Sequence, residues 1–308
     1  MRGLMGALLI AAATVVGASA ANAQAKIKVA YVPAVQLVDA HAAQQKGFFA
    51  KRGIEADLMT LGVSANMPAA LASGSVEIGA ATAPTFLQAV AGGLDLVIVS
   101  ANSVTEPNDA NAAMAREGSG IRNPQDFIGK KVGVPGLNAF LHVLFREWLT
   151  QKGVDYKRVG FVEAAFPQMA DMLKGNTLDA ALAVDPFYTR ILNAKAGYVV
   201  SHFTAELPTG TAVTLWISTR KWVSANSAVA KGFKEGLVEA QQFVRDNPAE
   251  ARKIIAEFTK LPPPVIEAMR LAVLRTETTE PQLQYWIDLM TKQEMINTKP
   301  DLKTLVMR

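Results

Sequence analysis

Hydrophobic and polar positions follow two alternating periods along the chain from Lys26 onward. Short apolar runs bounded by Gly, Pro or polar residues have the length of buried strands. Between them, apolar residues recur every three to four positions, as at Met67, Ala70 and Leu71, which is typical of amphipathic helices. Strands and helices in alternation predict a mostly parallel sheet covered by helices. The first four predicted strands are 27–32, 55–61, 76–81 and 94–100.

The same pattern starts again after a strand predicted at 111–116. Residues 74–80 lead to Pro84, and residues 175–181, which have a similar pattern, lead to Pro186. This internal repeat predicts two similar α/β lobes. We expect one lobe to contain residues 24–112 together with 217–308, and the other to contain residues 113–216. The strands predicted in the second half are 131–134, 158–163, 178–184, 198–203 and 211–218, and its longest helix follows Asn138 with apolar positions at Leu141, Leu144, Phe145, Trp148 and Leu149.

The N-terminus has the composition of a secretory signal. Arg2 provides a positive charge, residues 4–16 are mostly apolar, and Ala21 and Ala23 are small residues at the positions that a signal peptidase reads. We therefore expect residues 1–23 to form a signal peptide cleaved near Ala23. No later apolar stretch approaches the roughly 18 residues of a membrane span. The pattern predicts a periplasmic protein that is soluble after cleavage.

Charge and cysteine content narrow the function classes. The chain has 31 basic and 27 acidic residues, and the basic ones form no dense block of the kind that binds nucleic acid. It has no cysteine, which excludes disulfides, a lipid-modified N-terminal cysteine and a cysteine nucleophile. The histidines are His41, His142 and His202, far apart and outside any H-E-x-x-H spacing. We expect no metal site and no cofactor.

Four segments carry a resemblance to a known family. The chain resembles the periplasmic substrate-binding proteins of ABC transporters, in the group that handles nitrate, sulfonates, taurine and thiamine-type pyrimidines. The matches run in order over nearly the whole mature chain. The segments are QKGFFAKRGIE at 45–55, ALASGSVEIG at 70–79, DFIGKKVGVP at 126–135 and FVRDNPAEA at 243–251.

This resemblance implies a two-lobed periplasmic binding protein fold of type II, with the ligand cleft between the lobes. It also implies a monomer that captures a small molecule and docks transiently on an inner-membrane ABC permease. In such sheets ligands bind beyond the carboxyl ends of the strands, where helix N-termini offer unpaired N–H groups. The expected ligand-binding residues at these turns are Val35, Gln36, Ser64, Ala65, Ala81, Thr82, Gly136, Leu137, Asn138, Ala139, Phe166, Asp185 and Phe187.

An alternative interpretation of four of these residues is structural. Ser64, Thr82, Asn138 and Asp185 are residue types that commonly cap helix N-termini, and capping and ligand binding can coexist at one turn. Asp185 is alternatively the partner of a ligand amine. His41 and His142 lie early in predicted helices near the cleft turns, so each either contacts ligand or is structural. Trp216 is expected to pack in the core.

The residue types at the turns bear on the ligand class. Leu137, Phe166 and Phe187 predict a partly apolar pocket, which favours an organic anion of the sulfonate or carboxylate type over bare nitrate or sulfate. The first loop, residues 36–39, lacks the histidine that the pyrimidine binders of the group tend to carry, which disfavours that ligand.

Enzyme motifs are absent from the sequence. It contains no G-x-S-x-G, no S-x-x-K, no Walker loop and no G-x-G-x-x-G. We therefore expect a receptor and not an enzyme. Two alternatives stay open: a periplasmic sensor subunit that presents ligand to a receptor kinase, and a hydrolase or synthase without a recognisable motif on the same fold.

Overall fold

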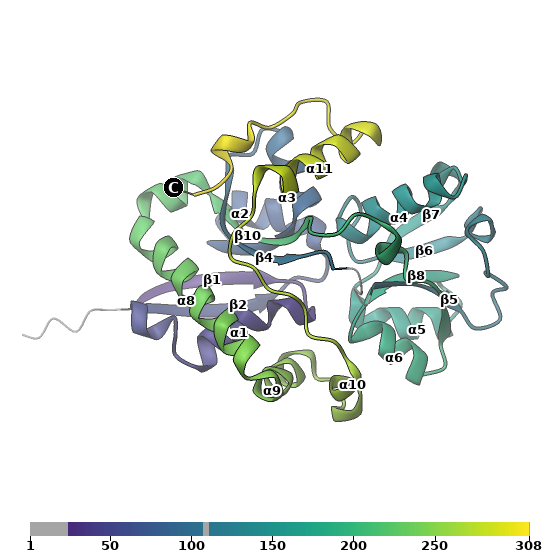
Figure 1. The fold of residues 1–308 in the computed structure, drawn as a ribbon, viewed down its shortest axis with the longest axis horizontal. Coiled ribbons are helices and arrows are strands. Elements are labelled where there is room, and N and C mark those ends of the chain that lie inside the picture. The colour runs from purple at the N-terminus through teal and green to yellow at the C-terminus, as the bar shows by residue number, and fades with distance from the viewer. Residues whose placement is uncertain (1–23, 107–110, 308) are drawn as a thin grey trace, which may run out of the picture.

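The structure is a computed structural model that describes residues 24–106 and 111–307, so the expected signal peptide lies outside the described residues. It contains two five-stranded sheets that lie side by side (Figure 1). The first has the order β2-β1-β3-β10-β4 and the second the order β7-β6-β8-β5-β9. The strands are β1 (Ala25–Tyr31), β2 (Ile54–Thr60), β3 (Ile78–Thr82), β4 (Leu96–Val104), β5 (Asn111–Arg116), β6 (Lys131–Val134), β7 (Gly160–Glu163), β8 (Ala180–Val184), β9 (Gly197–Ser201) and β10 (Ala212–Thr219).

The two sheets have the same topology. In each, the first strand pairs in parallel with the second and third, and one antiparallel strand is inserted between the third and fourth. The inserted strand of the first sheet, β10, follows all strands of the second sheet along the chain. The inserted strand of the second sheet, β5, comes directly before the other strands of that sheet. The predicted pair of similar, mostly parallel α/β units is confirmed.

Helices cover both faces of each sheet. In Figure 1, α1 and α8 lie on one side of the first sheet and α2 and α3 on the other, while α4 lies opposite α5 and α6 across the second sheet. No helix within residues 24–106 and 111–307 is long and apolar enough to cross a membrane. The helices are α1 (Val38–Gln45), α2 (Met67–Ala72), α3 (Ala83–Ala91), α4 (Phe140–Gln151), α5 (Met169–Lys174), α6 (Phe187–Asn193), α7 (Arg220–Ala225), α8 (Ser227–Asp246), α9 (Pro248–Thr259), α10 (Pro263–Ala268) and α11 (Glu280–Lys292).

After the first strand, the sequence predicts one helix from about Asp39 to near Gly53, and this prediction is wrong in its second half. The helix ends at Gln45, and the chain turns at Gly47, whose φ of 73° lies in the left-handed region that ends helices. A separate 3-10 turn follows over Ala50–Arg52. The helix after Asn138 is confirmed, and all five residues of its predicted apolar stripe are buried.

Aromatic side chains fill the interior of each half. In the first, Trp216 packs edge-on against Phe233, which stacks on Phe49. In the second, the ring of Phe145 contacts Trp148 and other aromatic rings. Trp216 is fully buried, so the expectation that it packs in the core is confirmed.

The chain passes between the two halves after β4 and again after β9. Since β5 begins at Asn111 and β10 at Ala212, the first passage ends before residue 111 and the second before residue 212. The boundaries expected at 112/113 and 216/217 therefore fall inside β5 and β10. Hydrophobic pattern identifies both strands but does not tell which sheet each strand completes.

Candidate ligand-binding cleft

A cavity of about 550 Å³ lies between the two halves. The first half contributes Val35 and Gln36, the second contributes Val184 and Asp185, and the C-terminal region contributes residues 269–273. A second pocket of about 60 Å³ adjoins it at the helix N-termini. The two share the lining residues Gln36, Phe140, Val184 and Val213.

The predicted site residues fall into three groups. Val35, Gln36 and Asp185 line the large cavity. The narrow pocket is lined by Gln36, Ser64, Ala81, Thr82, Ala139 and Phe166. Neither is lined by Ala65, Gly136, Leu137, Asn138 or Phe187.

Two of the predicted apolar contacts have other environments. The side chain of Phe187 is 2 % exposed and stacks on Phe166, with 5.3 Å between ring centroids, so it supports the pocket from behind. Leu137 is 40 % exposed, and its backbone N–H donates to Glu163 Oε1. The sequence showed that these residues follow strands, but not the direction in which their side chains point.

Thr82 caps a helix and also joins the halves. Its Oγ1 accepts a hydrogen bond from the backbone N–H of Thr85 in the first turn of α3, so the capping interpretation is confirmed for this residue. The same oxygen accepts from the N–H of Phe140, at the start of α4, over 3.3 Å. The hydroxyl therefore links the N-termini of helices from opposite halves.

Ser64 is not at an N-cap position, and Asp185 lies one position before Pro186, the N-cap of α6. The Oγ of Ser64 is buried, and within the described residues it has no hydrogen-bond partner. Asp185 Oδ1 accepts from Thr189 Oγ1 over 2.6 Å. Burial raises the pKa of Asp185 to about 6, while Thr189 and the charge of Arg270 act in the opposite direction.

The two halves are in direct contact at Gly136. The N–H of Ser64 donates to the carbonyl of Pro135 over 3.2 Å. A Cβ on Gly136 would collide with Ser64 Oγ and lie 3.3 Å from the backbone nitrogen of Ala65. Gly136 and Ala65 thus serve the fit between the halves.

Asn138 forms a turn that His142 fixes. Asn138 has a φ of 61°, and its N–H donates to Nδ1 of His142 over 2.8 Å. The capping interpretation is wrong for Asn138, because Ala139 is the N-cap of α4. Burial, together with the charge of Arg146, lowers the pKa of His142 to about 3. The neutral imidazole accepts the turn's N–H and lies outside both pockets.

His41 also has a structural environment. Its ring stacks on Phe258 of α9 with 4.1 Å between centroids and meets Tyr31 edge-on. Burial lowers its pKa to about 4. It lines neither pocket. Because it lies on α1 and stacks on Phe258 of α9, it helps to hold these two helices together.

A buried carboxylate fixes the first loop of the cleft. Asp39 Oδ2 accepts hydrogen bonds from Asn102 Nδ2, Gln241 Nε2 and Trp216 Nε1 over 2.9, 3.0 and 3.4 Å. Asn102 Nδ2 also donates to the carbonyl of Gln36. Burial raises the pKa of Asp39 to about 6 despite these donors. The donors come from positions too far apart in sequence to be anticipated.

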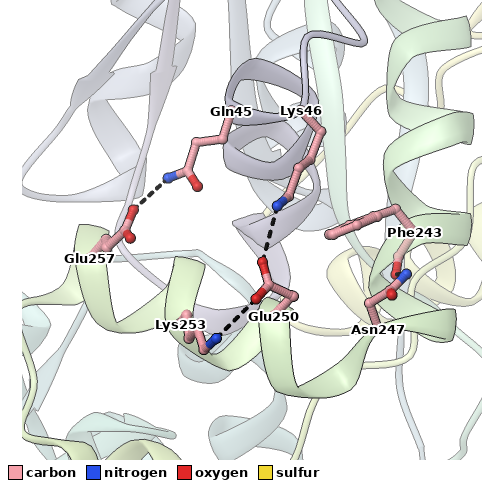
Figure 2. A network of polar contacts seen from close by, with 7 residues as sticks. All are labelled: Gln45, Lys46, Phe243, Asn247, Glu250, Lys253 and Glu257. Carbon is pink, nitrogen blue, oxygen red and sulfur yellow. Dashed lines mark hydrogen bonds and ion pairs between the residues drawn. The ribbon is translucent and has the colours of Figure 1, made fainter.

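The approach of the C-terminal region to the cleft has no signal in the sequence. Arg252 of α9 and Arg270 both line the large cavity. Figure 2 shows how α9 is fastened to the end of α1: Lys46 Nζ contacts Glu250 over 3.0 Å, and Gln45 Nε2 donates to Glu257 over 2.7 Å. These contacts hold α9 where it presents Arg252 to the cavity.

The chain is similar in sequence to curated solute-binding proteins. The chain is 23% identical over 218 residues to a formylaminopyrimidine-binding protein of Halalkalibacterium halodurans, covering 70% of this chain and 64% of that protein. It is 23% identical over 271 residues to the nitrate/nitrite binding protein NrtA of Nostoc sp., covering 80% of this chain and 61% of the relative. The chain thus spans less than two thirds of the length of these curated relatives.

A solved structure shows the same fold. The alkanesulfonate-binding protein SsuA from Xanthomonas axonopodis pv. citri, bound to MOPS, superimposes with a TM-score of 0.78 at 19% identity, covering 92% of this chain and 98% of that one. A structure with a TM-score of 0.75 is described as having the generic periplasmic binding protein fold. The predicted fold class is therefore confirmed. Residues 36–251 match the family model described as NMT1/THI5 like, and the chain belongs to this family.

Proposed function

We propose that the protein is a periplasmic solute-binding receptor of an ABC importer, which captures a small organic anion between two hinged lobes. The observation that carries the proposal is the cavity between the halves, lined by residues from both sheets and from the C-terminal region. Relatives and structural neighbours named for binding nitrate, alkanesulfonate and formylaminopyrimidine support it. In this proposal the two lobes are the two regions expected from the repeat.

Binding requires no covalent step in this proposal. The structure has direct contacts between the halves, from Phe140 N to Thr82 Oγ1 and from Ser64 N to Pro135 O. A ligand that contacts both lobes at once favours this closed arrangement over an open one by its difference in affinity for the two. The closed monomer then docks on a permease in the inner membrane. A sensor subunit that presents ligand to a receptor kinase would use the same cleft, and solute uptake by a deletion strain distinguishes the two roles.

The test is a thermal-shift screen of residues 24–308. The panel holds nitrate, ethanesulfonate, taurine, MOPS, aliphatic and aromatic carboxylates, amino acids and formylaminopyrimidine. A ligand at 100 times its Kd stabilises the folded state by about 2.7 kcal/mol, so binding by one chemical class is expected to raise Tm by several degrees.

Recovery of the ligand separates a receptor from an enzyme. Mass spectrometry of the bound compound after prolonged incubation should return its original mass. Conversion to a product would contradict a receptor role, and no shift from any member of the panel would contradict the proposed ligand class.

A further inference from the structure

The two parts of the cleft differ greatly in size. The narrow pocket at the helix N-termini has a volume of about 60 Å³. The adjoining cavity has about 550 Å³, which lies in the range of sites that enclose small organic molecules. The helix N-termini therefore have room for one small group, and the body of a ligand must lie in the cavity.

The walls of the large cavity are largely apolar. They combine aliphatic side chains of both lobes with an aromatic ring and with side chains of the C-terminal region. Such walls favour a ligand with an apolar body, because removing apolar surface from water is favourable. Representative wall residues are Val35, Phe140, Val184, Val213, Met269 and Leu271.

The charged groups of the cavity are balanced. Arg252 and Arg270 come from the C-terminal region, while Glu106 and Asp185 come from the segments near the passages between the lobes. Arg270 lies close enough to Asp185 for its charge to act on that carboxyl group. A lining with two positive and two negative side chains fits a ligand that carries both kinds of group better than a simple anion.

Arg252 has the most evident capacity for an anion. Its guanidinium donates to the carbonyls of Pro248 and Met269 over 3.4 and 3.3 Å, both long hydrogen bonds. Within residues 24–106 and 111–307 it forms no ion pair. A guanidinium half-buried at a cavity wall offers a planar set of donors that matches a carboxylate or sulfonate.

We propose, building on the receptor function above, that the cleft takes a bulky amphoteric organic acid. Its carboxylate or sulfonate lies against Arg252 and Arg270, its apolar body fills the large cavity, and an N–H group reaches Asp185. The C-terminal region thereby selects ligand size and charge. In this proposal the narrow pocket at the helix N-termini receives only a small part of the ligand.

Paired probes separate size from charge. Phenylalanine and 3-phenylpropanoate share an apolar body, glycine and acetate lack it, and only the first of each pair carries an amine. MOPS and taurine extend the comparison to a bulky and a small amphoteric sulfonate. In isothermal titration of residues 24–308 we expect phenylalanine to bind at least ten-fold more tightly than glycine, or MOPS at least ten-fold more tightly than taurine.

Substitutions test which side chain of the cavity binds each group of the ligand. R252Q and R270Q are each expected to raise the Kd of the bulky amphoteric probe about ten-fold, equivalent to about 1.4 kcal/mol. D185N should weaken binding of phenylalanine more than of 3-phenylpropanoate. R245Q, which changes an exposed arginine at the end of α8, is the matched control and should leave Kd unchanged.

The outcomes distinguish this inference from the receptor function. Tight binding of nitrate, taurine or ethanesulfonate with weak binding of the bulky probes would overturn the inference and leave the receptor function in place. An unchanged Kd in both R252Q and R270Q would do the same. Absence of binding by every probe would overturn this inference and contradict the proposed ligand class as well.

Discussion

Replacing His142 by Asn tests whether a neutral imidazole holds the turn before α4. In the folded protein Nδ1 of His142 accepts the N–H of Asn138, and the ring is 5 % exposed. An asparagine oxygen can accept the same hydrogen bond without titrating. The H142N variant therefore keeps the contact and loses the dependence on pH.

The expected change in the free energy of unfolding follows from the pKa shift of His142. Burial lowers the pKa of His142 from 6.5 to about 3, so the unfolded chain binds a proton at a pH where the folded protein does not. Stability from this group is fully present above pH 6.5 and is lost as pH falls toward 3. Between pH 7 and pH 5 the loss is about 2 kcal/mol, and it is nearly the same for any folded pKa well below 5.

The assay is urea denaturation at pH 7, 6 and 5, followed by tryptophan fluorescence. Asp39 and Asp185 act in the opposite sense, because burial raises their pKa from 3.8 to about 6 and they stabilise the fold as pH falls through about 6. His41, with its pKa lowered to about 4, acts in the same sense as His142. The wild-type profile mixes these contributions, but the difference between wild type and H142N isolates one of them.

We expect the wild type to lose about 2 kcal/mol relative to H142N on going from pH 7 to pH 5. A difference that stays constant within about 0.5 kcal/mol would refute the account, because it would mean that His142 is not held neutral by the fold.

Three further changes test the contacts between the halves and the turn before α4. G136A should weaken ligand binding at least about ten-fold by obstructing closure, and G136A combined with S64A should recover part of the loss in titration calorimetry, since the second substitution removes the colliding hydroxyl oxygen. N138A should lower the free energy of unfolding by about 1 kcal/mol because its φ of 61° disfavours alanine, whereas N138G should cost less; equal losses in urea denaturation would show that the backbone is not the cause. T82V should raise Kd about five-fold by removing the hydrogen bond from Phe140 across the cleft, and an unchanged Kd would exclude a role for that bond in closure.

Local pattern predicted most of the elements. The strand expected at residues 131–134 is β6 with the same limits, and the start of α3 at Ala83 follows from Thr82 and Pro84. The repeat correctly indicated two units of one topology. These features depend on residues close in sequence, and their signals need no knowledge of the tertiary fold.

The cleft was only partly predictable. Strand ends identified Val35, Gln36 and Asp185 as lining residues. Side-chain direction at a turn depends on the backbone conformation there, so the outward orientation of Leu137 could not be inferred. The approach of Arg252 depends on contacts between α1 and α9, which lie about 200 residues apart in the chain.

The most direct test of the central claim is the distance between the lobes with and without ligand. The chain has no cysteine, so D57C on β2 and K174C on α5, both at exposed positions, give a unique pair of sites for spin labels. Double electron–electron resonance on residues 24–308 should show a broad or long distance without ligand. A probe that raises Tm should convert it to one shorter distance. An unchanged distribution at saturating probe would contradict capture between two hinged lobes.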